Sequence, residues 1–124
     1  IAGLNIKYSA FPFLNNTLSS QTLTVFSLIS LINATNFLDG LNGLLAGSVV
    51  LTLGFIILMT PLFSIPSIYA LLLISAILGF FIYNFPHGKI FMGDIGSTFL
   101  GLSLGVIALL TQDSAPLTSE TAWI

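Results

Sequence analysis

The chain has 124 residues, of which 56% are hydrophobic and 5% are charged, with a net charge of −2 and a mean hydropathy of +1.09. Soluble domains carry about 25% charged residues, so this composition excludes an ordinary water-soluble domain. The acidic balance without a basic patch excludes a nucleic-acid partner, and the lack of cysteine excludes disulfides and thiolate chemistry.

Long stretches without charge predict an all-α, polytopic membrane protein. No Asp, Glu, Lys or Arg occurs from Tyr8 to Leu38 or from Gly40 to Gly88. Each stretch exceeds the roughly 20 apolar residues that cross a bilayer. Helices are expected because unpaired backbone groups in lipid are costly, and the continuous apolar runs do not fit alternating barrel strands. Four spans are predicted within one membrane domain, at residues 22–37, 44–63, 67–83 and 95–111.

The segments between the predicted spans are polar or contain proline. Residues 1–20 are mixed and are expected to form a loop or a short re-entrant piece. Pro61 and Pro66 mark a short turn after the second span, since proline removes a helical hydrogen bond. The stretch 84–88 breaks the third span, and the tail from residue 112 is polar enough to leave the bilayer.

Four crossings place the loop after the first span and the loop after the third span on the same face of the membrane. These loops hold Asp39, His87, Lys89 and Asp94. Polar groups from two separated segments are therefore expected to meet there. Lys89 and His87 favour the cytoplasm for this face, whereas Lys7 would lie on the opposite side, so charge alone leaves the orientation open.

Three amides and one carboxylate gather around the end of the first span. Asn33, Asn36 and Asp39 are spaced three apart, which puts them on one face of a helix. Asn42 follows in the loop, where neighbouring glycines allow a sharp turn and a close approach of the backbone to a ligand. A polar helix end with an Asx turn is the structural alternative. Polar groups at membrane depth are costly, which favours a functional site.

The start of the fourth span has the features of a phosphate and metal site. The helix N-terminus near Gly93 presents free N–H groups, and the Ser97 hydroxyl could donate to the same phosphate. Asp94 offers the hard oxygen ligand that magnesium prefers, shared with substrate phosphates. Asp94 could also cap the helix, and the two roles are compatible.

The residues before this helix have two interpretations each. Phe91 could stack on a base or face lipid. Lys89 could pair with a phosphate as a point charge or extend to the lipid headgroups. His87 is interpreted as a loop histidine rather than a catalyst. Farther along the span, Gly101 and Gly105 are expected to let helices pack closely.

Two segments carry a resemblance to a known family. Asn33–Gly47 (NATNFLDGLNGLLAG) and Asn84–Gly101 (NFPHGKIFMGDIGSTFLG) resemble two signature motifs of the polyprenyl-phosphate N-acetylhexosamine-1-phosphate transferases. The second segment is the more specific, because IFMGDIGS is rarely met by chance. The resemblance implies a magnesium-dependent integral membrane enzyme of the bacterial inner membrane. It would move a sugar-1-phosphate from a UDP-sugar to undecaprenyl phosphate, release UMP and have its active site on the cytoplasmic side.

The resemblance also implies roles for individual residues. Asp94 matches the magnesium-binding aspartate and Asp39 an essential acidic residue, and these two are the expected catalytic residues. The remaining expected substrate-binding residues shape the nucleotide and phosphate site, with Phe91 at the position that stacks on uracil. They are Asn33, Asn36, Asn42, Asn84, Lys89, Phe91, Gly93 and Ser97.

The chain departs from the family pattern in three places. Asn42 replaces a second aspartate of the first motif, so a negative charge is lost there. An upstream Asp-Asp pair and a downstream basic loop of the family are not in the sequence. We therefore expect an internal fragment that is inactive alone. An ion-coupled transporter and an inactive membrane subunit are the alternatives, and a homodimer is left open.

Overall fold

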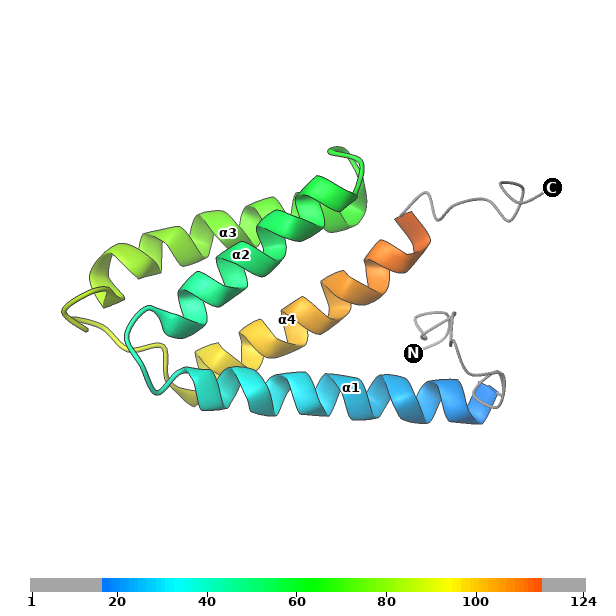
Figure 1. Ribbon diagram of the computed structural model, residues 1–124, viewed down its shortest axis with the longest axis horizontal. Coiled ribbons are helices and arrows are strands. Elements are labelled where there is room, and N and C mark those ends of the chain that lie inside the picture. Colours follow the sequence, from blue (N-terminus) through cyan, green and yellow to red (C-terminus); the bar gives the residue numbers. More distant parts are fainter. Residues whose placement is uncertain (1–16, 115–124) are drawn as a thin grey trace.

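The computed structural model describes residues 17–114, and this part of the chain consists of four α-helices without a strand (Figure 1). The helices are α1 (Thr17–Leu38), α2 (Leu44–Met59), α3 (Ile65–Asn84) and α4 (Gly93–Ser114). The predicted all-α fold is confirmed. The expectations for residues 1–16 and 115–124 lie outside the described residues.

The first helix begins earlier than the sequence predicts, because α1 includes residues 17–20, for which a loop is expected. Its hydroxyl side chains explain how a polar stretch stays helical. The Thr22 Oγ1 hydroxyl donates to the Leu18 carbonyl at 2.8 Å, and Thr24 donates to the Ser20 carbonyl at 2.8 Å. Hydroxyls bonded to carbonyls one turn back are satisfied inside the helix, so they do not need a loop or water.

Proline sets the turn between α2 and α3. Thr60 has an extended conformation (φ −121°, ψ 152°), so α2 ends at Met59, before the predicted end of the span at Phe63. The residue before a proline disfavours helical dihedrals, and Thr60 precedes Pro61. By contrast, Pro66 lies in the first turn of α3, where its missing N–H leaves no helical bond unmade.

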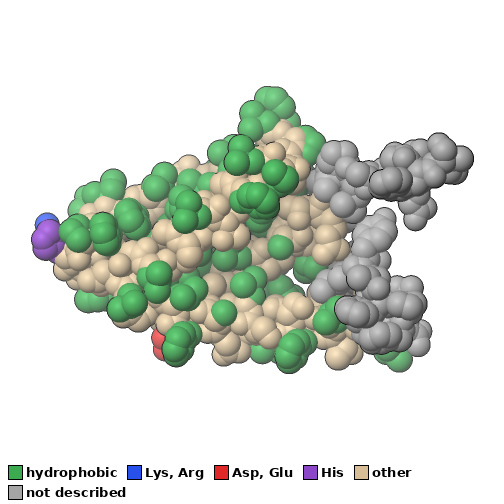
Figure 2. Space-filling view, in the orientation of Figure 1, with side chains coloured by type: hydrophobic (Ala, Val, Ile, Leu, Met, Phe, Trp, Pro, Cys, Tyr) green, Lys and Arg blue, Asp and Glu red, His purple; other side chains and the backbone are tan. Residues whose placement is uncertain are grey.

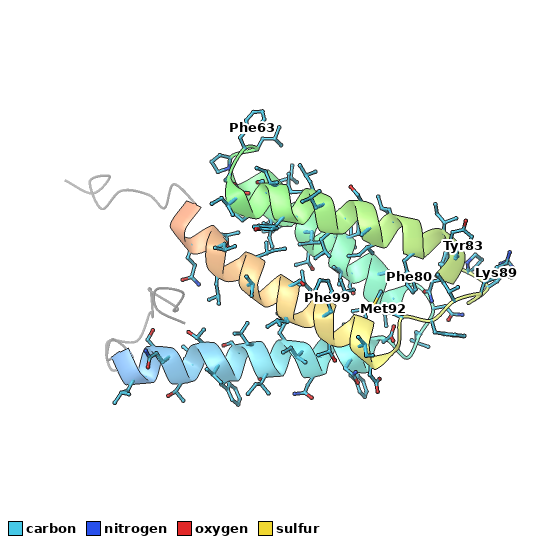
Figure 3. All side chains as sticks on the ribbon, turned by 180° about the vertical axis from the view of Figure 1, so that it is seen from behind. Phe63, Phe80, Tyr83, Lys89, Met92 and Phe99 are labelled. Carbon is cyan, nitrogen blue, oxygen red and sulfur yellow. The ribbon has the colours of Figure 1, made fainter. Side chains whose placement is uncertain are left out.

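Three of the helices are long and apolar enough to cross a membrane, at Leu18–Leu38, Ile65–Asn84 and Gly93–Gln112. The remaining helix, α2, has 16 residues, a length of about 24 Å. Figure 1 shows successive helices running in alternating directions, so that the α1–α2 and α3–α4 loops lie at one end of the bundle. Phe63, in the α2–α3 turn, and Lys89, in the α3–α4 loop, lie at opposite ends in Figure 3.

The helices pack mainly in two pairs, α1 with α4 and α2 with α3. Gly101 and Gly105 of α4 lie against α1, in agreement with the close packing that the glycine spacing predicts. A Cβ atom on Gly101 would come within 2.8 Å of the Ile32 Cα atom, and one on Gly105 would collide with the Leu28 side chain. Small residues allow such a close approach of helices in membranes. A core of Leu45, Val49, Leu53, Ala70, Ile77, Leu100, Leu104 and Ile107 joins α2, α3 and α4.

The outside of the bundle is largely apolar. Figure 2 shows hydrophobic side chains spread over the visible face, with the coloured charged and histidine side chains toward one end. Leu51, Leu58, Leu72 and Ile82 are each at least 64% exposed on α2 and α3. An apolar surface of this extent is stable in lipid and not in water, in agreement with a multi-pass membrane protein.

Candidate active site at the loop end of the bundle

The loops after α1 and after α3 meet at one end of the bundle. In Figure 1, the end of α1 and the start of α4 lie side by side, and both loops are at this end. Hydrogen bonds between residues far apart in sequence join the two segments, including one from Asn36 to Asp94 and one from Gly43 to Asn84. The expectation that polar groups of two separate stretches meet on one side is therefore realised in the structure.

Asn36 connects α1 to the first turn of α4. Its Nδ2 atom is 3.3 Å from Asp94 Oδ1 and 3.1 Å from Ser97 Oγ, and it donates to both. The Ser97 hydroxyl in turn donates to the Asp94 carbonyl at 3.2 Å. Because α4 begins at Gly93, Asp94 lies inside the first turn rather than before it. Asn36 therefore contacts the Asp94 carboxylate, and Ser97 binds the Asp94 backbone.

Asp39 follows α1 directly and lies beside Asp94. The Gly93 backbone N–H lies close enough to the Asp39 carboxylate to influence its pKa. Burial raises the pKa of Asp39 above 3.8, the negative charge of Asp94 raises it further, and the nearby Gly93 N–H opposes both. Two carboxylates close enough to influence each other form an acidic site that favours a bound cation.

Asn84 joins the two loops from inside the protein. It is the last residue of α3 and is 6% exposed. Its Oδ1 atom accepts a hydrogen bond from the Gly43 backbone N–H at 2.6 Å, and its Nδ2 atom donates to the Ile90 carbonyl at 2.8 Å. Both ends of the amide are therefore bonded to backbone groups, one in each loop.

Glycines with positive φ angles shape both loops. Gly43 (φ 77°) packs so closely on Phe85 that a Cβ atom would come within 2.7 Å of the ring, and Gly88 (φ 57°) packs in the same way on the Asn42 amide. Only glycine adopts this conformation without strain. Asn42 therefore lies against the second loop, and its contact with a substrate stays a prediction.

The other expected site residues differ in exposure. Phe91 is 76% exposed and lies three residues before Asp94 in sequence, and Lys89 is also exposed, at the tip of the second loop in Figure 3. Asn33 is exposed and donates to the Ile29 carbonyl of its own helix. Ser97 is fully buried and already bonded, so it supports Asp94 from within. Substrate contacts by these residues stay predictions.

The donor set at this end suits magnesium better than zinc. Magnesium is commonly held by one or two carboxylates together with substrate phosphates, and Asp39 and Asp94 provide such a pair. Among residues 17–114, no group of three or more His, Cys, Asp and Glu side chains gathers as a closed metal site would require. The residues present therefore fit a metal that is completed by its substrate.

Sequence reasoning missed the backbone groups that hold this site. The Gly43 N–H and the Ile90 carbonyl were not predicted as partners of Asn84, and Phe85 was not predicted to support Gly43. Backbone partners leave no residue-type signal. The contact between Gly43 and Phe85 depends on the packing of α2 against α3, which the sequence does not indicate.

Comparison with known proteins identifies similar sequences. The family model described as Glycosyl transferase family 4 matches residues 1–112. A Bacillus subtilis protein named "Probable undecaprenyl-phosphate N-acetylglucosaminyl 1-phosphate transferase" is 40% identical over 114 residues, covering 87% of this chain and 32% of the relative. The Mycolicibacterium smegmatis "Decaprenyl-phosphate N-acetylglucosaminephosphotransferase" is 40% identical over 112 residues, covering 82% of this chain and 27% of the relative.

A third relative has a different named substrate. The "Phospho-N-acetylmuramoyl-pentapeptide-transferase" of Oceanobacillus iheyensis is 36% identical over 94 residues, covering 73% of this chain and 28% of the relative. The chain thus spans about a third or less of the length of these curated relatives. No solved structure gives a significant match to the chain.

Proposed function

Because the chain belongs to glycosyl transferase family 4, we propose that it is part of a membrane enzyme that loads a lipid carrier with a sugar phosphate. The enzyme transfers an N-acetylhexosamine-type sugar-1-phosphate from a UDP-sugar to a polyprenyl phosphate and releases UMP. The names of the relatives support this proposal, since two of them are polyprenyl-phosphate N-acetylglucosamine-phosphate transferases. The reaction belongs to cell-envelope polysaccharide synthesis.

The juxtaposition of Asp39 and Asp94 carries the proposal. Two carboxylates from distant parts of the chain lie close enough at the end of the bundle to influence each other, and Asn36 donates a hydrogen bond to Asp94. Three of the four helices around them are long enough to cross a membrane. A site at such an end can receive a water-soluble nucleotide and a membrane-embedded phosphate at the same time.

Asp94, with Asp39 beside it, would hold magnesium. When bound, magnesium neutralises charge on the diphosphate and polarises it. Phosphoryl transfer depends mainly on positioning and charge stabilisation, so the residues need to orient groups more than to form bonds. We assign Asp39 to organising the site, because its carboxylate is close enough to the Gly93 N–H and to Asp94 for both to influence its pKa.

The transfer itself follows from the chemistry of the two substrates. An oxygen of the lipid phosphate attacks the β-phosphorus of the UDP-sugar. The bond from this phosphorus to the bridging oxygen breaks, and UMP leaves with the bond's electron pair. The start of α4 contributes the positive end of the helix dipole and N–H groups near the phosphates. Phe91, exposed next to this helix, would stack on the uracil ring.

The site is proposed to face the cytoplasm from the bacterial inner membrane. Lys89 and His87 are in the second loop, and basic residues favour the cytoplasmic side. The cytoplasm also contains the nucleotide sugars that the reaction uses. The polar residues gather at one end of the bundle rather than at its middle, which favours a transferase over an ion-coupled transporter.

The test measures sugar transfer by the full-length enzyme in membranes. Radiolabelled UDP-N-acetylglucosamine and polyprenyl phosphate are supplied with and without magnesium, and label is counted in the lipid extract. We expect magnesium-dependent incorporation. The Asp94→Asn variant should lose transfer by about 100-fold or more while its expression is unchanged, because a neutral amide holds magnesium more weakly and the charge on the diphosphate is then not neutralised.

Ser75→Ala is the matched control for this experiment. Ser75 is exposed on α3, far from the loops, and bonds to the Leu71 carbonyl of its own helix. It should transfer sugar at the parent rate. Incorporation that is independent of magnesium, or normal turnover by Asp94→Asn, would remove Asp94 from the metal role.

A further inference from the structure

Asn84 has both amide atoms engaged inside the protein. It is 6% exposed, its Oδ1 atom accepts from Gly43, and its Nδ2 atom donates to Ile90. An asparagine that touched the nucleotide would need at least one amide atom directed outward. The geometry instead directs both ends of the amide to backbone groups.

The two partners belong to different loops of the site. Gly43 closes the loop that begins with Asp39, whereas Ile90 lies in the loop that leads to Phe91 and Gly93. Phe85 strengthens the same junction, since its ring packs on Gly43 and stacks on Phe81 with ring centroids 5.4 Å apart. One buried side chain therefore connects the segment after Asp39 to the segment before Asp94.

The end of α3 does not require this side chain. Backbone bonds close the last turn: the Phe85 N–H donates to the Phe81 carbonyl at 2.9 Å, the Gly88 N–H donates to the Asn84 carbonyl at 2.8 Å, and the Lys89 N–H donates to the Tyr83 carbonyl at 3.0 Å. The Asn84 side chain is therefore not needed to cap α3. Its two bonds serve the arrangement of the loops.

We propose that Asn84 is a positioning residue that holds the second site loop against the first. It acts on Phe91 and Asp94 through Ile90, and on the loop after Asp39 through Gly43. The consequence for catalysis rests on the proposed function, whereas the consequence for loop geometry does not. Losing the amide removes two hydrogen bonds between α3 and the loops, so only the packing of Gly43 on Phe85 and of Gly88 on Asn42 still joins the loops before any substrate binds.

The first experiment measures the loops directly. Nitroxide labels are placed at Leu41→Cys and His87→Cys, one on each loop, in full-length enzyme without other cysteines. Dipolar broadening is recorded without nucleotide or magnesium. We expect strong, uniform coupling in the parent and in the Ser75→Ala control, and weaker, broader coupling in Asn84→Ala.

A graded variant keeps the test informative if Asn84→Ala does not fold. Asn84→Asp retains the acceptor for the Gly43 N–H but loses the donor to the Ile90 carbonyl. We expect its coupling to be intermediate. In the transfer assay, kcat/KM should fall about tenfold or more in Asn84→Ala and less in Asn84→Asp, because each tenfold change corresponds to about 1.4 kcal/mol, near the value of one hydrogen bond.

The outcomes separate positioning from direct contact. Parent-like coupling in both Asn84 variants, with weakened UMP binding, would identify a substrate contact and overturn the proposal. Parent-like coupling with parent-like activity would overturn it as well. If the parent enzyme transfers no sugar phosphate, the proposed function fails, but broadened coupling in Asn84→Ala would still establish the loop-holding role.

Discussion

The ionisation of Asp39 depends on its place between two site segments. Burial and the charge of Asp94 make the folded protein bind this proton more tightly than the unfolded protein does. The resulting stabilisation is complete below pH 3.8, the ordinary value, and is lost as the pH rises through the raised pKa. Asp39 therefore costs stability at neutral pH in the absence of a cation.

This linkage predicts the behaviour of Asp39→Asn. The amide does not ionise, so the apparent melting temperature of the variant should fall less than that of the parent as the pH rises from about 3.5 to 6. The measurement is thermal unfolding of the full-length protein in detergent with EDTA. Parallel pH profiles for the two proteins would show that Asp39 does not have a raised pKa.

Gly88 predicts a second effect of a single residue. Its φ is 57°, and a Cβ atom added there would lie 2.7 Å from Asn42 Nδ2, so Gly88→Ala introduces both strain and a collision. We expect a loss of about 1–2 kcal/mol from the left-handed conformation alone. Gly40→Ala is the control, because its nearest neighbour, the Phe37 carbonyl oxygen, is at an ordinary 3.7 Å. Equal melting temperatures for the two variants would contradict the loop geometry.

At the level of residues, the sequence predicted which side chains gather but not what each contacts. The spacing of Asn36 and Asp39 placed both near the end of one helix, and Asn36 does reach Asp94. The burial of Ser97 could not be predicted, because it depends on how α1 covers the first turns of α4. Residue type shows a capacity to donate or accept, whereas tertiary packing decides which partner is used.

Among the helices, the contact between α1 and α4 depends on Gly101. A Cβ atom there would come within 2.8 Å of the Ile32 Cα atom and would collide with the Thr35 hydroxyl, so Gly101→Ala must push the helices apart. We expect a destabilisation of about 1–3 kcal/mol, as for other overpacked sites. The measurement is thermal unfolding of the full-length protein, with transfer activity recorded in parallel.

Gly79→Ala is the matched control for the helix contact. Gly79 lies in α3 with nothing within 4 Å of a Cβ atom, so the added methyl group meets open space. Alanine favours a helix over glycine by up to about 1 kcal/mol, so this variant should be as stable as the parent or slightly more stable. Similar losses in both variants would indicate a general sensitivity to glycine replacement and not a specific α1–α4 contact.

Helix positions were predictable because long apolar runs and prolines have direct physical consequences. Pro61 and the loop 85–92 interrupt the helices where the sequence indicated. The predicted start of α1 was wrong, because a loop was expected over residues that are helical. Hydroxyl groups there donate to carbonyls of their own helix, so these polar residues do not interrupt it. The pairing of α1 with α4 was not predictable, because α1, α2 and α3 have no strongly one-sided apolar face to indicate a partner.

For the whole molecule, the alternating helices predict which positions share a side of the membrane. Single cysteines at Leu41 and His87 should react with an impermeant maleimide from the same side, and a cysteine at Phe63 should react from the other. Sealed right-side-out and inside-out vesicles distinguish the two sides. Labelling of Leu41→Cys and Phe63→Cys from one side would contradict the alternation of α1, α2 and α3.

The close contact between the α1 and α4 backbones has a consequence for how such enzymes diversify. Asp39 and Asp94 are attached to these two helices, whose separation is set at Gly101 by backbone atoms rather than by long side chains. In the proposed transferase, loop residues other than these two carboxylates can therefore change while the separation of the two helices stays the same. The proposed enzyme could then evolve to use a different UDP-sugar while Asp39 and Asp94 keep their relative positions.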